Sequence, residues 1–147
     1  MKNIYLDVCA LCRPYDDQTY TRIHLETTAV QLILRAVEKS VYRMVYSPVH
    51  EIEISALSDD IERADLLYLI EKIAFRSEQA GSHARKRAEE LARSGFGIAD
   101  AAHIAYAEKM QASFISCNDK LIKKCLRSRI NIWTGSPIMF CEKEDIK

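Results

Sequence analysis

The sequence lacks two features that would place it in a class at once: a long apolar run and a surplus of one charge. Basic and acidic residues number 21 each, so the formal net charge at pH 7 is zero. Without about 18 consecutive apolar residues no membrane-spanning helix is expected. Without a basic surplus, any contact with nucleic acid must be a local patch. The first residues do not form a signal-peptide pattern, so we expect a soluble, cytoplasmic protein that makes no membrane contact.

Linkers, internal repeats and low-complexity segments are also absent, which predicts a single domain over residues 1–147. The five cysteines are an odd number, and this favours reduced thiols in a cytosol over a disulfide framework. Cys9 and Cys12 form one CxxC pair, but the second pair of a typical zinc site is missing. We therefore expect both to be buried thiols.

Hydrophobic periodicity predicts alternating strands and helices. Strands are expected over residues 3–7, 42–46, 113–116 and 131–133. Helices are expected over about residues 18–39, from residue 48 onward, and over about 60–75, 78–94, 98–110 and 119–126. The alternation predicts an α/β fold with three α/β/α layers and a central parallel sheet of four to five strands.

Three finer expectations accompany this assignment. Asp16 or Asp17 is expected to cap the first long helix, and Glu26 is expected on its solvated face. Residues 134–137 are interpreted as a loop, and residues 138–140 as a tail docked on the sheet edge.

Isolated acids stand where the predicted elements meet. Asp7 closes the first strand, and Asp119 follows the third. Glu51 lies one helical turn after the second strand, and Asp100 lies in the first turn of a helix. In a parallel sheet all these positions can converge on the carboxyl edge, where ligands bind. Carboxylates gathered there repel one another unless a cation joins them, and a hard divalent metal is the natural occupant.

The order and spacing of these motifs resemble the PIN-domain family, small metal-dependent ribonucleases that include the VapC-type toxins of toxin–antitoxin pairs. The segments that carry the resemblance cover nearly the whole chain: IYLDVCAL at 4–11, YSPVHEIE at 46–53, GIADAAHIAYAEKM at 97–110, FISCNDKLIKKC at 114–125 and INIWTGSPIMF at 130–140. The resemblance implies a PIN-like fold.

By this resemblance Asp7, Glu51 and Asp100 match the family's first, second and third acids, Glu51 by its offset from Ser47. The family's fourth site is a Ser or Thr, one residue, and then an Asp or Asn. The run Ser116-Cys117-Asn118 has that spacing, so Asn118 is the formal counterpart and Asp119 is its neighbour.

The implied reaction is hydrolysis of RNA phosphodiester bonds at Mg²⁺ or Mn²⁺. Asp7, Asp100 and the pair Asn118 and Asp119 would hold the metal, and Glu51 would stand near a second ion or a bound water. Two ions about 4 Å apart can activate the attacking water and stabilise the leaving oxygen. The resemblance also implies an antitoxin partner and a homodimer.

Two other functions compete with this hypothesis. The chain departs from the family pattern at Val8-Cys9, where a small hydroxyl residue and then Asn are usual. This departure and Asn118 favour a catalytically weak or inactive PIN-like module that binds RNA or protein. A phosphotransfer protein would need a second acid close to Asp7, and Cys9 stands there instead.

Several residues have a structural alternative beside the catalytic one. Glu53 competes with Glu51, since the two are about 200° apart on a helix. Asp119 reads equally as a helix cap and as a ligand. Asp100 alone would be explained by the helix dipole, and only together with Asp7 does it indicate a site. His103 is expected to pack rather than to bind metal.

Two basic stretches and two residues past the first acid are candidates for contact with RNA phosphates. The stretch beside the fourth acid site contains Lys120, Lys123, Lys124, Arg127 and Arg129. Its position favours guiding an RNA backbone toward the metals, and Arg13 and Tyr15 are expected to line the same cleft. The other stretch, over residues 83–93, is interpreted as a solvated helix face.

Overall fold

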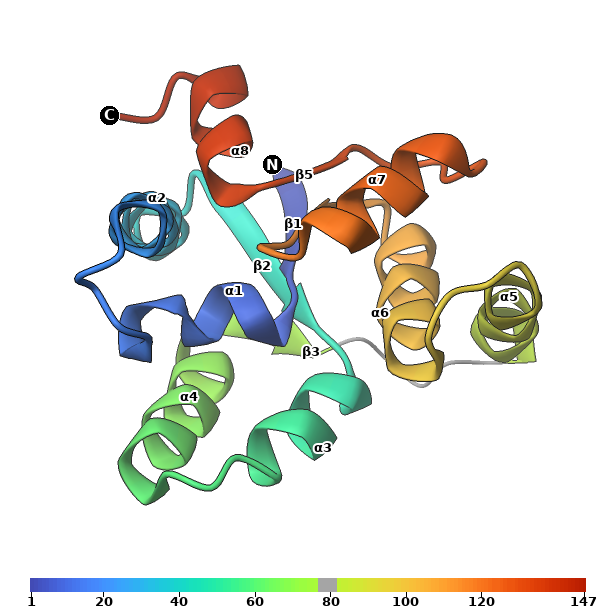
Figure 1. Cartoon of the computed structure of the whole chain (residues 1–147), viewed down its shortest axis with the longest axis horizontal. Helices are drawn as coiled ribbons and strands as arrows, with labels where there is room; N and C mark the ends of the chain where they lie inside the picture. Colours follow the sequence, from blue (N-terminus) through green and yellow to red (C-terminus); the bar gives the residue numbers. More distant parts are fainter. Residues whose placement is uncertain (77–81) are drawn as a thin grey trace.

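A computed structural model describes residues 1–76 and 82–147 of the chain. These residues form a five-stranded sheet with helices on both faces (Figure 1). The strands are β1 (Lys2–Leu6), β2 (Tyr42–Tyr46), β3 (Ala74–Arg76), β4 (Ala112–Ile115) and β5 (Thr134–Gly135). The helices are α1 (Val8–Cys12), the 3-10 helix η1 (Arg13–Tyr15), α2 (Thr21–Glu38), α3 (Pro48–Ser55), α4 (Asp60–Ile73), α5 (Ser82–Arg93), α6 (Ile98–Lys109), α7 (Asp119–Arg127) and α8 (Pro137–Glu144). Among the described ranges no helix is long and apolar enough to cross a bilayer.

The sheet is parallel throughout, and its strand order is β3-β2-β1-β4-β5. The chain therefore builds outward from β1 to β3 and then returns to the other side of β1 with β4. In open parallel sheets this switch point, between the carboxyl ends of β1 and β4, is where ligands bind. The predicted three-layer α/β/α class with a parallel sheet is confirmed.

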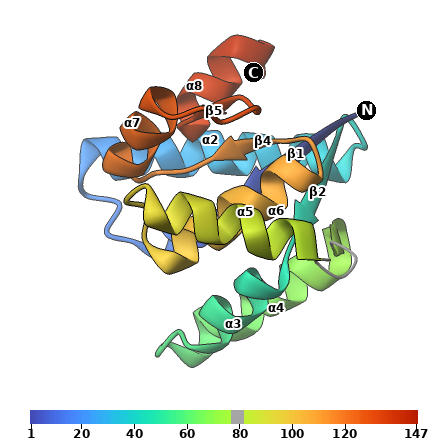
Figure 2. The same ribbon diagram turned by 90° about the vertical axis from the view of Figure 1, so that its right-hand side faces the viewer.

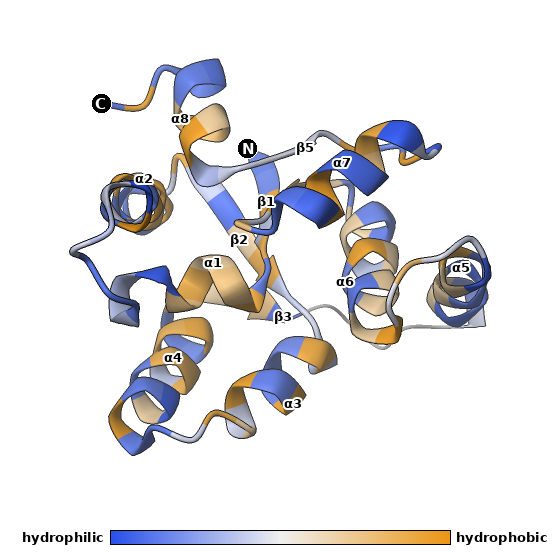
Figure 3. Cartoon of the chain, in the orientation of Figure 1, coloured by the Kyte–Doolittle hydropathy of each residue, from blue (hydrophilic) through white to orange (hydrophobic). Residues whose placement is uncertain are grey.

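Two apolar cores cover the two faces of the sheet. Along β1 the side chains alternate, so that Ile4 and Leu6 join one core and Tyr5 joins the other. The first core is completed by α1, α2, α4 and α8, and the second by α5, α6 and α7. Figure 2 views the molecule from the α5 side, where α5 packs on α6. Figure 3 shows α1 in apolar colours, whereas α7 is drawn mainly in hydrophilic colours.

Helix starts are fixed by short polar side chains, as the sequence indicates. Ser47 caps α3, and Pro48 takes the first helical position. The Ser47 hydroxyl accepts from Val49 N at 3.2 Å, and the ring of His50 accepts from Ser47 N at 3.1 Å. These bonds set the direction in which α3 leaves the carboxyl end of β2.

The helix predicted over about residues 60–75 is too long. It ends at Ile73, and residues 74–76 form the edge strand β3, in which Ala74 pairs with Met44 of β2. Tertiary pairing overrides the helical periodicity here, because the chain can add a strand to the open edge of the sheet. The helix predicted over about residues 78–94 is described from Ser82 to Arg93, and residues 77–81 lie outside the described part.

Other boundaries also differ from the prediction. The strand expected over residues 131–133 is wrong: β5 is Thr134–Gly135, in the expected loop, and Trp133 O already accepts from Phe114 N at 2.8 Å. Residues 138–140 belong to the helix α8 rather than to a docked tail.

The first long helix begins at Thr21, and neither Asp16 nor Asp17 caps it. Asp17 instead accepts from the backbone N of Thr19 at 3.0 Å and from its hydroxyl at 2.7 Å. The carboxylate therefore closes a local turn, and this turn delays the helix by about one turn.

Candidate active site at the carboxyl edge of the sheet

Asp7 stands at the switch point of the sheet and is 6% exposed. Its backbone N–H donates to Ile115 O at 3.0 Å, so the residue leaves β1 directly beside the end of β4. Its Oδ1 accepts from Ala10 N at 3.1 Å and caps α1. Burial raises the pKa of this carboxyl well above its ordinary value. A buried acid held in this way is the candidate for charge compensation by a cation.

Cys9 supports Asp7 at the position where the sequence departs from the pattern of the family that it resembles. The Cys9 thiol donates to Asp7 Oδ1 at 2.9 Å and lies 3.6 Å from the hydroxyl of Ser116. The thiol thus takes a hydrogen-bonding role at this position. Cys9 and Cys12 are only partly buried, and all five cysteines are free thiols.

Asp100 lies in the first turn of α6, whose N-terminus reaches the same carboxyl edge. The side chain is half-buried, and its pKa is raised by that burial first and also by the negative charge of Glu53. The positive charge of Lys124 acts in the opposite direction. The pKa of the Cys125 thiol is raised to about 12 by burial first, and the negative charges of Asp100, Glu108 and Asp7 act in the same direction. By topology both acids lie at the carboxyl edge of the sheet, because Asp7 follows β1 and Asp100 begins the helix that runs back to the amino end of β4.

Glu53, rather than Glu51, extends from α3 toward Asp100. Its carboxylate contacts Nε2 of His103, which is 3% exposed on α6. The Nδ1 atom of His103 lies 2.5 Å from the hydroxyl of Tyr5, and that hydroxyl lies 2.8 Å from Ser47 Oγ. An imidazole that donates from Nε2 to Glu53 and accepts at Nδ1 from Tyr5 satisfies both contacts.

Glu51 points to the opposite side of α3. It accepts from Arg76 Nε at 2.7 Å, and both side chains are roughly half exposed. The helical separation of the two glutamates is as expected, but the structure brings Glu53 toward Asp100 and leaves Glu51 beside β3. The Glu51 carboxylate is thus paired with Arg76, whereas the Glu53 carboxylate contacts His103.

The fourth site is formed by the turn after β4. Ser116 is fully buried, and its hydroxyl accepts from Asn118 N at 3.0 Å. Asn118 Oδ1 accepts from Leu121 N at 3.2 Å, so Asn118 is the N-cap of α7. The cap role considered for Asp119 therefore belongs to Asn118, and Asp119 occupies the first helical position.

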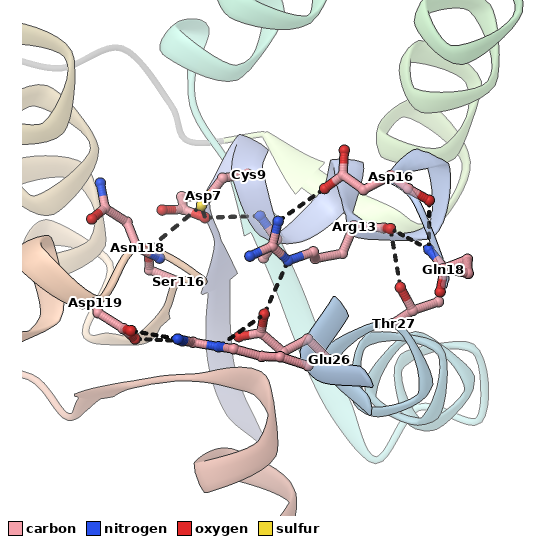
Figure 4. A network of polar contacts seen from close by, with 12 residues as sticks. Asp7, Cys9, Arg13, Asp16, Gln18, Glu26, Thr27, Ser116, Asn118 and Asp119 are labelled. Atoms are coloured by element: carbon pink, nitrogen blue, oxygen red, sulfur yellow. Dashed lines mark hydrogen bonds and ion pairs between the residues drawn. The ribbon is translucent and has the colours of Figure 1, made fainter. Parts of the chain in front are cut away.

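Asp119 pairs with Arg22 of α2, and its carboxylate lies beside the turn that holds Ser116 and Asn118 (Figure 4). Its two oxygens accept from the guanidinium of Arg22 at 2.5 and 2.6 Å. Behind this pair lies Glu26, which is 1% exposed and accepts from Arg13 Nε at 3.0 Å. The expectation that Glu26 lies on a solvated face is wrong, because Arg13 and Arg22 compensate its charge inside the fold.

The expected RNA contacts are distributed unevenly. Lys120 and Lys123 are exposed on α7, and Lys124 is partly buried. The Lys124 ammonium donates to Gly95 O at 2.8 Å and lies over the ring of Phe96, so it is tied to the loop that precedes Asp100. Arg13 forms ion pairs with Asp16 and Glu26. Its guanidinium is therefore engaged within the fold at the carboxyl edge of the sheet.

Hard oxygen donors suit Mg²⁺ or Mn²⁺, and Asp7, Asp100 and Glu53 supply them. Over residues 1–76 and 82–147, no three His, Cys, Asp or Glu side chains stand as an assembled metal-binding group. The pKa values of Asp7 and Asp100 are both raised, and a bound cation would reverse that effect. The donor chemistry therefore fits such an ion, although the ligands are not drawn together.

Sequence reasoning missed Tyr5, Arg22 and the buried position of Glu26. Tyr5 sits inside an apolar strand, and nothing in its pattern indicates that its hydroxyl meets an imidazole. Arg22 and Glu26 are four residues apart on a helix, which is a signal for a side-chain pair. That spacing cannot show that the pair faces the sheet edge rather than the solvent.

No family model and no curated protein matches the sequence. Among solved structures, the crystal structure of FitAcB from Neisseria gonorrhoeae is similar, with a TM-score of 0.55. The match covers 92% of this chain and 98% of that chain, at 13% sequence identity. At this identity the likeness concerns the fold alone, and it supports a PIN-like fold for this chain.

Proposed function

We propose that the protein is a metal-dependent ribonuclease that hydrolyses RNA phosphodiester bonds at the carboxyl edge of its sheet. The observation that carries the proposal is the placement of buried Asp7 and half-buried Asp100 around the switch point, each with a raised pKa. Two carboxyl groups whose charged forms are disfavoured by their surroundings fit a site that is completed by a cation. Mg²⁺ or Mn²⁺ is the cofactor proposed.

A bound divalent ion supplies an activated water and stabilises the leaving oxygen of a phosphodiester. Asp7 and Asp100 would hold the ion. The hydrogen bonds from Ala10 N and Cys9 Sγ hold the Oδ1 atom of Asp7, and the Ser116 hydroxyl also hydrogen-bonds to this carboxyl, so its direction is fixed for a metal. Asn118 lies beside them with its amide oxygen used in the cap of α7.

Glu53 is proposed as the second acid of the site in place of Glu51. His103 positions its carboxylate, and Tyr5 fixes the imidazole from the other side. Tyr5 of β1 thus holds His103, and His103 holds the Glu53 carboxylate. The negative charge of Glu53 in turn raises the pKa of Asp100. Glu53 is therefore a base for the attacking water or a ligand to a second ion.

The resemblance to VapC-type toxins extends the proposal to a biological setting. We propose that the chain acts in the cytoplasm on RNA, as a homodimer, and that an antitoxin protein controls it. Such a partner would place a cationic or bulky side chain among the carboxylates and block the site.

The test is cleavage of single-stranded RNA with Mg²⁺ or Mn²⁺ by the wild type, Asp7→Asn and Asp100→Asn. Both variants are expected to lose at least about a hundredfold in rate, as expected for residues that hold a catalytic ion. Glu38→Gln is the matched control, because it removes one exposed carboxylate from α2. If Asp7→Asn and Asp100→Asn cleave as fast as Glu38→Gln, the assignment is wrong.

A second function is favoured by the absence of an assembled three-residue metal group in the described residues. In this alternative the chain is a non-catalytic PIN-like module that binds RNA or a protein. Calorimetry with Mn²⁺ separates the two: the nuclease binds the ion in the millimolar range or better, whereas the module does not.

A further inference from the structure

Arg22 and Asp119 form a second polar centre beside the acids. The two come from α2 and α7, elements far apart in the sequence, and they meet at the end of β4 next to the turn that holds Ser116 and Asn118 (Figure 4). This centre therefore borders the place where the proposed reaction occurs.

The Arg22–Asp119 contact has the geometry of anion recognition. Two guanidinium nitrogens donate to two carboxylate oxygens at 2.5 and 2.6 Å, and the side chains are 56% and 51% exposed. A phosphate group offers oxygen pairs that the same planar fork accepts. Because both side chains are about half exposed, a phosphate from solvent can reach the guanidinium and compete with the carboxylate for the same donors.

The surroundings of Asp119 are positive on several sides. The pKa of its carboxyl is lowered by the hydrogen bonds from Arg22 first, and also by the charges of Lys123 and Arg13. Any anion at this position meets the same charges. Asp119 thus marks an anion position rather than a free metal ligand.

Buried Glu26 holds the arginines in place. It accepts from Arg13 Nε at 3.0 Å and lies 3.6 Å from Arg22 Nε. Arg22 thereby keeps one edge of its guanidinium toward Glu26 and presents the fork toward Asp119. The 3-10 helix η1, which carries Arg13, is fixed in turn by Gln18 and Thr27, which both donate to Arg13 O.

We propose that Arg22 binds a backbone phosphate of single-stranded RNA, and that Asp119 is an internal competitor that occupies the Arg22 fork when RNA is absent. The inference rests on the proposed function for its ligand, since RNA is the substrate proposed there. It assigns Asp119 a role opposite to that of a metal ligand. Removing this carboxylate favours RNA binding, whereas removing a metal ligand does not.

The test is the dissociation constant for a fluorescently labelled single-stranded RNA, measured by anisotropy in EDTA so that no metal contributes. Arg22→Ala is expected to raise the constant about five- to tenfold and to reduce the slope of log K against log salt by about 0.7, the value for one phosphate contact on a single strand. Arg22→Lys keeps the charge without the fork and is expected to fall between the wild type and Arg22→Ala. Asp119→Asn is expected to lower the constant about two- to fivefold.

The matched controls are Arg93→Ala and Glu89→Gln, which alter an exposed ion pair on α5. They change the net charge by the same amount as the test variants, so they measure the non-specific effect of charge. The proposal is supported when both test variants shift affinity clearly more than their controls, at unchanged melting temperature. It is overturned when Arg22→Ala matches Arg93→Ala, or when Asp119→Asn matches Glu89→Gln or binds RNA more weakly.

Two further arms separate this proposal from others. Binding of polyglutamate is measured in the same way. If the wild type and Arg22→Ala differ in affinity for polyglutamate but not for RNA, the site binds protein carboxylates and the RNA proposal is wrong. RNA cleavage with Mn²⁺ is recorded in parallel. A correct binding pattern without cleavage retains the phosphate site and rejects the nuclease, whereas cleavage without the binding pattern rejects the phosphate site alone.

Discussion

Asp7→Asn is expected to stabilise the metal-free protein while it abolishes the proposed activity. Asn preserves the side-chain oxygen that accepts from Ala10 N and Cys9 Sγ, so the cap of α1 remains. What disappears is a charge that is 6% exposed and has no cation beside it. Incomplete compensation of a buried polar or charged group costs about 1–3 kcal/mol. For a chain of this size that gain raises the melting temperature by about 2–12 °C.

The stability difference between Asp7→Asn and the wild type is expected to change with pH in a defined direction. Burial raises the pKa of Asp7 in the folded state, so above the unfolded pKa of about 3.9 the folded protein binds more protons at this site than the unfolded chain does. The wild type therefore loses stability relative to Asp7→Asn as pH rises from about 4 through the raised pKa. Below about 4 both states are protonated and the difference vanishes.

Thermal unfolding in EDTA between pH 4 and pH 8 measures both effects. Asp7→Ala is the control, because it removes the charge and the cap together and so loses about 1 kcal/mol of the gain. Mn²⁺ is expected to raise the melting temperature of the wild type and not that of Asp7→Asn. A variant that melts at or below the wild-type temperature at pH 8, or a gap that does not grow with pH, would refute the reasoning from burial.

Three other predictions follow from the geometry. Glu53→Gln is expected to lower RNA cleavage at least about tenfold more than Glu51→Gln, measured as initial rates, because only Glu53 contacts His103 and acts on Asp100; equal losses would contradict the placement. Ile33→Ala, at a fully buried position of α2, is expected to cost about 2–5 kcal/mol in denaturant unfolding, and a cost below 1 kcal/mol would contradict the packing. Gly135→Ala would place a methyl group 2.5 Å from the indole of Trp133, so chemical unfolding should show a loss of about 1–3 kcal/mol, and no loss would contradict this close approach.

The fold class was predictable from sequence because the apolar periods of the central strands and of the long helices are clear. The positions of the two edge strands, β3 and β5, were not predictable from the sequence. Residues 74–76 extend a helical pattern and become β3 only because β2 offers an open edge, and β5 is two residues long. Strands as short as these carry no period of their own, so their position depends on the partner strand.

The choice between Glu51 and Glu53 shows where sequence reasoning about the site ends. On α3 the buried residues are His50 and Ile54. At about 100° per residue, the two glutamates flank this buried stripe on opposite sides, each about 80° from its centre. The pattern is symmetrical, and only the packing of α3 against α4 and α6 decides which glutamate faces His103.

The positions of Asp7 and Asp100 in the fold were predictable because each stands at a topologically fixed place, one at a strand end and the other at a helix start. The position of Glu26 was not predictable, because its place four residues after Arg22 is equally typical of a surface pair. Its burial depends on Arg13, which belongs to the separate 3-10 helix η1. An ion pair between residues 13 positions apart in the sequence, such as Arg13 and Glu26, leaves no local pattern that a sequence reading can detect.

The most direct test of the central claim is a crystal of the wild-type protein soaked in millimolar Mn²⁺, with anomalous diffraction used to locate the ion. The account predicts a peak in direct contact with the carboxylates of Asp7 and Asp100. An empty difference map between these two residues, with Mn²⁺ bound elsewhere or nowhere, would contradict it.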